Sequence, residues 1–220
     1  MAASGKSFAI IGLGTFGSTV AMELVRFGNY VLGIDIDEKR ANRLADTLSE
    51  VIITDASDEA ALREVGLANY DVVLVAVGED FEACILATMN ARLLGAKTIW
   101  VKAISRTQHR ILSKLGADRI VHPESEYGQH IAQMLHNPLV KDYVKLGNGF
   151  HVFDIEVSKR GAGESISSLK LGDFDLRCLG LMRGTKFFDC SQPDLLMQVG
   201  DLLLILGRRV DLRRFSDSLT

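Results

Sequence analysis

Three glycines near the start of the chain have the spacing of a phosphate-binding turn. Gly12, Gly14 and Gly17 follow an apolar segment, residues 8–12, and precede a segment with apolar residues at helical spacing. In such a strand-turn-helix unit the first glycine allows a tight turn, the second lets the backbone approach a pyrophosphate, and the third lets the helix pack closely on the strand. The N-terminus of the helix offers unpaired N–H groups to the phosphates. The motif in this context predicts phosphate binding.

An acidic residue follows at the distance that a ribose site needs. Asp35 ends the next predicted strand, residues 30–35. A carboxylate there accepts hydrogen bonds from ribose hydroxyls and repels a 2′-phosphate, so the sequence disfavours NADP. The glycines and Asp35 also fit a purely structural role in the turn and the helix cap. The common register of strand, glycines, helix, strand and acid favours nucleotide binding.

Other residues end later predicted strands. Because the carboxyl ends of parallel strands meet at one edge of a sheet, we expect these residues at the same crevice. They are Asp55, Ala56, Ala76, Val77, Gly78 and Lys102. Position alone also fits a turn role for Asp55 and a solvated surface charge for Lys102.

The histidines give little support for catalysis. His109 and His122 lie near the crevice loops, where structural or ligand contacts are more typical than a general base. No histidine pairs with an acid or a lysine at a recognisable catalytic spacing. The sequence favours a binding module without catalytic residues. A small NAD-dependent oxidoreductase is the alternative, and a redox-sensing transcriptional regulator is a weaker third hypothesis.

The elements that position these residues alternate between strand and helix. The predicted strands are residues 8–12, 30–35, 51–54, 72–77, 98–101 and 119–122. The predicted helices after the first are residues 38–48, 58–65 with Ser57 as N-cap, 81–94, a helix capped by Ser105 that ends at Leu115, and 124–135. Strict alternation predicts an α/β fold, a Rossmann-like doubly wound parallel sheet of six strands.

The pattern changes after residue 136. We expect a nucleotide-binding domain over residues 1–136, a linking helix and hinge over 137–149 with a short helix at 139–144, and a small α+β domain over 150–220. Within the last domain, residues 179–183 and 186–189 are predicted to form a hairpin across Gly184 and Thr185.

Composition narrows the possible partners. A formal charge of -3 offers no general basic field for nucleic acid. The longest apolar runs are far shorter than the roughly 20 residues of a membrane-spanning helix. The first residues lack a signal peptide, so we expect a cytosolic protein with reduced thiols. Cys84, Cys178 and Cys190 are therefore expected to be packing residues outside any disulfide framework.

Taken together, the motifs resemble a known family. The chain is similar to the cytosolic regulatory subunits of Ktr and Trk potassium uptake systems, which are RCK proteins (regulators of potassium conductance), and is closest to the Ktr type. The resemblance covers essentially the whole chain. It rests on the glycine motif of residues 12–17, Asp35, Trp100-Val101-Lys102-Ala103, residues 115–120, His122-Pro123-Glu124, and residues 200–207.

The resemblance implies a ligand and an assembly. It implies a nucleotide-binding lobe for ATP, ADP or NAD(H) and a C-terminal regulatory lobe. It also implies homodimers that form an octameric ring beneath a membrane-embedded, potassium-translocating partner, at the inner face of the cell membrane. Some relatives bind cyclic di-AMP in the C-terminal lobe, but no residues for that ligand can be matched here.

The resemblance also implies residue roles. Asp35 and Asp37 would lie at the adenosine ribose, Asp55 and Ala56 near the adenine, and Glu124 near the phosphates, where it would hold Mg²⁺ or Ca²⁺ at the dimer interface. The predicted set is completed by neighbours in the chain, Thr15, Phe16, Ile36 and Ala103. Ktr subunits commonly carry arginine where this chain has Thr15. A hydroxyl cannot supply that charge, so NAD(H) and ADP remain candidates beside ATP unless Lys102 or Arg106 compensates.

Overall fold

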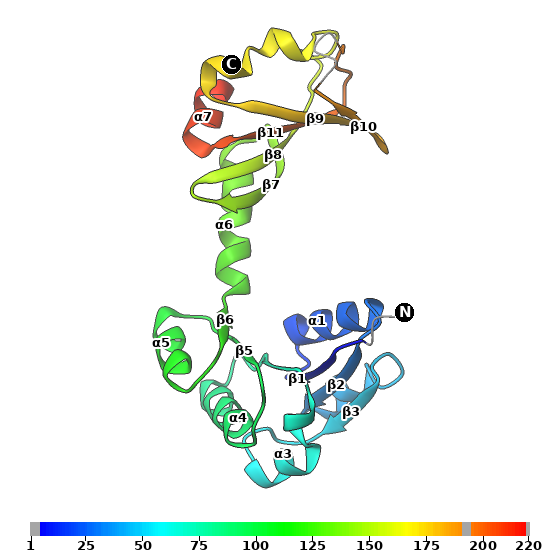
Figure 1. Ribbon diagram of the computed structural model, residues 1–220, viewed down its shortest axis with the longest axis vertical. Helices are drawn as coiled ribbons and strands as arrows, with labels where there is room; N and C mark the ends of the chain where they lie inside the picture. Colours follow the sequence, from blue (N-terminus) through cyan, green and yellow to red (C-terminus); the bar gives the residue numbers. More distant parts are fainter. Residues whose placement is uncertain (1–4, 191–194, 219–220) are drawn as a thin grey trace. The chain divides into compact units, whose positions relative to one another are not determined.

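The computed structural model describes residues 5–190 and 195–218. The chain divides into two compact units, Met1–Ser125 and Glu126–Thr220 (Figure 1). Among the helices of the described residues, none is long and apolar enough to cross a membrane.

The first unit is built on a parallel sheet. Its six strands lie in the order β3-β2-β1-β4-β5-β6 and all pair in parallel. Their bounds are β1 (Ser7–Ile11), β2 (Tyr30–Asp35), β3 (Glu50–Ile53), β4 (Val72–Val75), β5 (Ile99–Lys102) and β6 (Arg119–Val121). This order confirms the predicted doubly wound sheet. The strand order reverses between β1 and β4, which is where ligands bind in such folds.

Helices cover both faces of this sheet. They are α1 (Thr15–Arg26), α2 (Glu38–Asn42), α3 (Glu59–Val65), the short η1 (Leu67–Asn69), α4 (Phe81–Leu93) and α5 (Arg106–Lys114). Alternate strand residues point to opposite faces, so Ile10 packs in the core that contains Ala21 of α1. Ile11 packs in the core that contains Leu62 of α3, Cys84 of α4 and Leu112 of α5. Figure 1 shows α1 on one side of the sheet and α3, α4 and α5 on the other.

Two helix predictions differ from the structure. The helix predicted over residues 38–48 ends at Asn42, although Leu44 and Leu48 beyond it are still buried. Asp58, not Ser57, caps α3, because its carboxylate accepts hydrogen bonds from the N–H groups of Ala60 and Ala61 at 2.8 and 3.3 Å. The predicted cap at Ser105 is confirmed by its hydrogen bond from the Gln108 N–H at 3.1 Å.

The second unit holds an antiparallel sheet in the order β10-β9-β11-β8-β7. Helix α6 (Pro123–His136) begins in the first unit and leads into it. The other bounds are β7 (Val140–Gly147), β8 (Phe150–Glu156), η2 (Ile166–Leu169), η3 (Leu171–Phe174), β9 (Arg177–Arg183), β10 (Lys186–Asp189), β11 (Leu202–Arg208) and α7 (Arg209–Ser218). The predicted hairpin between β9 and β10 is confirmed.

The prediction of a short helix over residues 139–144 was wrong, because β7 occupies this segment and pairs with β8. The buried residues Val140 and Tyr143 lie three positions apart, which imitates helical spacing. This spacing arises because the pairing with β8 shifts register between Val140 and Asp142. The segment 137–149 is therefore not a linking helix, and its role as a hinge stays a prediction.

The expectation that Cys178 and Cys190 are packing residues outside any disulfide was also wrong. Cys178 and Cys190 form a disulfide, with their Cα atoms 6.4 Å apart. They are twelve positions apart in the chain, but the β9–β10 hairpin folds back and brings them together. Cys84 is a free, buried thiol in the first unit, as expected.

Candidate functional site

The glycine loop connects β1 to α1, and two of its glycines cannot be replaced without strain. Gly12 has a φ of +94°, and a Cβ atom on it would lie 3.0 Å from the carbonyl carbon of Ala76 and 3.1 Å from the nitrogen of Val77. A Cβ atom on Gly17 would overlap the carbonyl oxygen of Gly12. These contacts support the predicted tight turn and the close packing of helix on strand.

Gly14 differs from the other two because it faces open space. No atom lies within 4 Å of the position that its Cβ would take. Gly14 is the N-cap of α1, and among the described residues no side chain caps this helix and no acid occupies its first turn. The first N–H groups of α1 are therefore available to an anion, with the helix dipole in their favour.

Asp35 is buried beneath this loop. Its side chain accepts hydrogen bonds from the backbone N–H of Leu13 at 2.6 Å and of Asp37 at 2.8 Å, one on each carboxylate oxygen. The residue is only 6% exposed. A carboxylate has about four acceptor sites, so each oxygen can accept one further hydrogen bond, as a ribose would require. Asp35 therefore positions the glycine loop.

A basic residue that the sequence did not single out lies beside Asp35. The guanidinium of Arg40 is 4.0 Å from the Asp35 carboxylate and 3.6 Å from that of Asp37. Asp37 caps α2 by accepting hydrogen bonds from the N–H groups of Lys39 and Arg40. These backbone hydrogen bonds lower the pKa of Asp37, which keeps it ionised. The spacing of three residues between Asp37 and Arg40 was the available signal for this pair.

The turn after β3 is fixed from within and from α4. Asp55 accepts hydrogen bonds from the hydroxyl and the N–H of Ser57 at 2.7 and 2.8 Å, which lower the pKa of Asp55. The buried Asn90 of α4 donates to the carbonyl oxygens of Ala56 and Ser57 at 3.3 and 2.9 Å. Asn90 escaped sequence interpretation because its partners lie more than thirty residues away.

Lys102 links three parts of the predicted crevice. Its ammonium group pairs with Glu124, lies 5.8 Å from the centre of the Phe16 ring, and approaches Gly78, where a Cβ atom would be 3.1 Å from Nζ. Its side chain is only 13% exposed. Burial raises the pKa of Glu124, but the hydrogen bond and charge of Lys102 oppose it, and the net shift is downward. The Lys102 side chain is therefore mostly buried and is not a freely solvated surface charge.

His109 pairs with His122. Nδ1 of His109 and Nε2 of His122 are 2.9 Å apart, and the two rings are within 14° of parallel. One ring must donate to the other. The neighbouring Ala103 is buried, and its N–H donates to the carbonyl of Val121 at 2.9 Å, joining β5 to β6.

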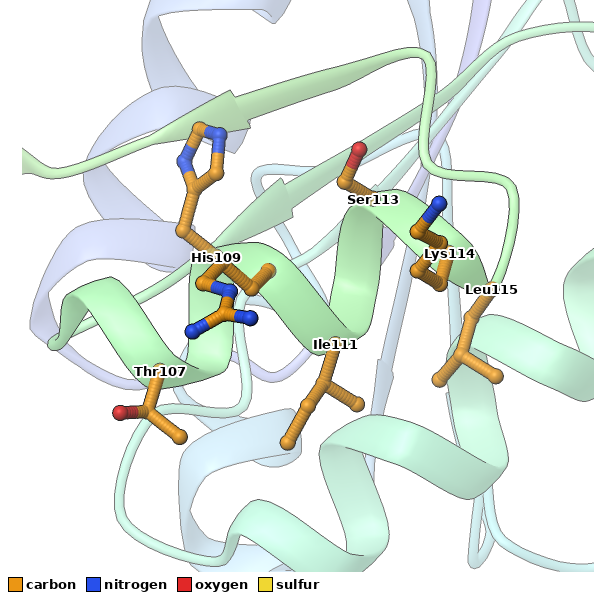
Figure 2. Close-up of a pocket in the computed structure, with 7 residues that line it drawn as sticks. Thr107, His109, Ile111, Ser113, Lys114 and Leu115 are labelled. Atoms are coloured by element: carbon orange, nitrogen blue, oxygen red, sulfur yellow. The ribbon is translucent and has the colours of Figure 1, made fainter.

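An open pocket lies along α5, apart from the glycine loop. It is lined by Thr107, His109, Arg110, Ile111, Ser113, Lys114 and Leu115. In Figure 2, His109 points to the opposite side of α5 from Thr107 and Ile111. Of the predicted site residues, this pocket contains only His109.

The structure brings some of the predicted residues together in three groups. They are Gly12, Gly17, Ala76 and Val77; Phe16, Gly78, Lys102 and Glu124; and Asp35 with Asp37. Ile36 and Thr15 have exposed side chains beside these groups. The Asp55 carboxylate accepts its hydrogen bonds from Ser57, within its own turn. Within residues 5–190 and 195–218, no three histidine, cysteine or acidic side chains are grouped to hold a metal ion.

The chain matches the model of the TrkA-N domain family over residues 8–123. It is 36% identical to Ktr system potassium uptake protein A of Vibrio alginolyticus over 203 residues, which cover 92% of each chain. It is 35% identical to Ktr system potassium uptake protein C of Bacillus subtilis over 211 residues, 96% of each chain.

Solved structures share the fold at low sequence identity. A GsuK channel bound to NAD matches with a TM-score of 0.61 and 14% identity, over 96% of this chain and 39% of that one. The TrkA-N domain of the inner membrane protein ybaL from Escherichia coli matches with a TM-score of 0.53 and 17% identity, over 61% of this chain and 99% of that one. The chain belongs to the TrkA-N domain family and is related over nearly its whole length to the Ktr system potassium uptake proteins.

Proposed function

We propose that this chain is the nucleotide-sensing regulatory subunit of a potassium uptake system, working without catalysis at the cytoplasmic face of the membrane. The observation that carries the proposal is the glycine loop. The loop presents an open backbone at Gly14, and among the described residues no side chain caps the N-terminus of α1. The ammonium group of Lys102 lies 5.8 Å from the centre of the Phe16 ring, in the first turn of this helix. The relatives named for Ktr potassium uptake support the physiological context.

The residues present fit an adenine dinucleotide or diphosphate. The pyrophosphate would lie against Gly14 and the first N–H groups of α1. The ribose hydroxyls would donate to the free acceptor sites of Asp35, with Asp37 beside it. The adenine would extend toward Ile36, Asp55 and Ala56.

The basic side chains near the glycine loop bear on how many phosphates the ligand carries. Thr15 supplies a hydroxyl at the position where Ktr subunits commonly have arginine, so Lys102 is the cation that meets the phosphates, with Arg106 the next along the chain. A compact ammonium group neutralises about as much charge as one phosphate oxygen carries. The proposal therefore ranks NAD(H) and ADP above ATP.

Glu124 gives the nucleotide a route to the second unit. It is paired with Lys102, and it is the second residue of α6, which continues into the second unit. A bound phosphate competes with Glu124 for Lys102. Nucleotide binding would thereby change the contacts at the start of α6.

A divalent cation is a further part of the proposal. Glu124 offers one carboxylate, whereas Mg²⁺ needs about six oxygen ligands. Phosphate oxygens, water and a second copy of the chain would have to supply the rest, which is why we place the Mg²⁺ or Ca²⁺ at the dimer interface.

The assembly converts binding into regulation. Homodimers would form an octameric ring beneath the potassium-translocating subunit. A nucleotide can regulate that ring only by binding one of its shapes more tightly than another.

The experiment is potassium uptake in cells that lack their own uptake systems. The chain would be co-expressed with the translocating subunit of a Ktr system, as wild type or as Gly14→Ala. The proposal predicts uptake that depends on the wild-type chain and is reduced with the variant. Equal uptake with both chains, at equal expression, would overturn it. The mass of the purified protein distinguishes an octamer from a dimer.

A further inference from the structure

The disulfide between Cys178 and Cys190 lies at the free end of a hairpin. Cys178 is in β9, and Cys190 directly follows β10. The last backbone pair of the hairpin joins Asp189 to Gly180. At the other end the strands are connected through Gly184 and Thr185. The hairpin is thus closed covalently at both ends while the disulfide is intact.

The strand that this bond secures is at the edge of the sheet. β10 has only four residues, and its one partner in the described sheet is β9. Phe187 is 55% exposed and packs its ring over Gly180, whose missing side chain leaves the space for it. Short edge strands with one partner open more readily than central strands.

The partner strand is itself irregular beside Cys178. On β11, Leu204 pairs with Gly180 and the next residue, Ile205, pairs with Cys178, so Leu179 is an extra residue in β9. Such a bulge interrupts the backbone ladder at that point. Fewer backbone hydrogen bonds therefore hold the Cys178 end of β9 against β11, and the disulfide supplies a constraint there.

We propose that Cys178 and Cys190 form a site of reversible oxidation that exchanges with small-molecule thiols and disulfides of the glutathione class and latches β10 to β9. The oxidation joins two thiols: one thiolate attacks a glutathione disulfide and releases one glutathione thiol. The second thiolate then attacks the mixed disulfide and releases the other. Two protons and two electrons leave the cysteine pair, and one glutathione disulfide becomes two thiols.

The assignment of a regulatory role rests on the proposed cytoplasmic location, because disulfides there are reducible and act in sensing. The third cysteine provides the internal contrast. Cys84 is 2% exposed, and burial raises its pKa to about 11. A buried thiol of that kind reacts slowly with disulfides and alkylating reagents.

The first measurement is a redox titration of the purified full chain, without nucleotide or partner, in buffers of varied ratio of reduced to oxidised glutathione. After acid quenching and alkylation, mass spectrometry gives the state of each cysteine. We expect Cys178 and Cys190 to change together, with the midpoint inside the titrated range. A pair that stays alkylatable in the most oxidising buffer, or stays bonded in the most reducing one, would overturn the proposal.

The second measurement tests the latch through hydrogen exchange of the β10 amides. Closing a loop of this length restricts the open state by on the order of 100-fold, so exchange over 186–189 should be faster in the reduced chain by about that factor. Cys178→Ser and Cys190→Ser should each match the reduced wild type, and Cys84→Ala should match the oxidised one. Equal exchange in both redox states would refute the latch. Neither result depends on nucleotide binding, so this proposal and the proposed function fail separately.

Discussion

The carboxylate of Asp35 accepts a hydrogen bond from the backbone N–H of Leu13 at 2.6 Å, so the acid predicted for the ribose also holds the phosphate loop. Its other oxygen accepts from the N–H of Asp37. One buried side chain therefore sets the position of both the glycine loop and the start of α2. In the proposed binding mode, this side chain would couple the phosphate site to the ribose site.

Asp35→Asn should reduce both stability and nucleotide affinity. An amide NH₂ group would face one of the two backbone N–H donors, leaving a buried donor unsatisfied, at a cost of about 1–3 kcal/mol in the free energy of unfolding. Urea unfolding and NADH fluorescence titration measure the two effects. Asp58→Ala is the control, since losing the α3 cap costs about 1 kcal/mol but should leave affinity unchanged. Wild-type affinity in Asp35→Asn would contradict the coupling.

Gly14→Ala and Gly17→Ala should separate binding from folding. Alanine at Gly14 meets open space, so the free energy of unfolding should change by less than about 0.5 kcal/mol. Its methyl group would occupy the proposed phosphate position and should lower the affinity for nucleotide about tenfold or more. Alanine at Gly17 overlaps the Gly12 carbonyl and should destabilise the chain by about 1–3 kcal/mol.

Gly128→Ala supplies the matched control for these two variants. Gly128 lies in α6 and also has open space at its Cβ position. The Gly128→Ala variant should bind NADH with the affinity of the wild type. If Gly14→Ala likewise bound NADH normally, the phosphate would have to lie elsewhere.

Lys102→Met and Glu124→Gln should act in opposite directions. Without Lys102 the phosphates lose their nearest cation, so affinity for ADP should fall about tenfold and depend less on salt. Neutralising Glu124 frees Lys102 from its ion pair, so affinity should rise in magnesium-free buffer. Fluorescence competition titrations at two salt concentrations test this, with Lys114→Met on α5 as the neutral comparison. Weaker ADP binding by Glu124→Gln without magnesium would argue against the exchange of partners.

Acid should weaken the second unit through Asp201. Arg183 donates to both of its carboxylate oxygens, at 2.9 and 2.8 Å, and this hydrogen bonding outweighs burial and lowers the pKa of Asp201. A lowered native pKa means that the stabilisation is present above the ordinary value of 3.8 and is lost as the pH falls through the native value.

Asp201→Asn tests this pH dependence. At pH 7 it should speed hydrogen exchange of the β11 amides by on the order of tenfold, and the difference from wild type should shrink below about pH 4. Arg213→Met removes an exposed ion pair with Asp217 and should have no measurable effect. A difference that stayed constant down to pH 2.5 would assign Asp201 another role.

Local backbone requirements made the glycine loop predictable from the sequence. Within six residues, a tight turn requires glycine at Gly12, open backbone is found at Gly14, and close packing of α1 on β1 requires glycine at Gly17. Asp35 is predictable because it ends a strand. The contacts of Asn90 with Ala56 and of Arg40 with Asp35 depend on how distant or adjacent elements pack, so no spacing rule revealed them.

Tertiary pairing also explains the wrong predictions. β7 carries buried residues at a helix-like spacing, and only its pairing with β8 makes it a strand. Likewise, Cys178 and Cys190 are twelve positions apart in the chain, and the pairing of β9 with β10 brings them together.

Calorimetric titration of the purified chain with NADH, ADP and ATP tests the central claim most directly. The account predicts saturable binding, tighter for NADH and ADP than for ATP, that is lost or strongly weakened in Gly14→Ala while the variant unfolds like the wild type. Absence of binding for all three nucleotides, or equal binding by wild type and Gly14→Ala, would contradict it.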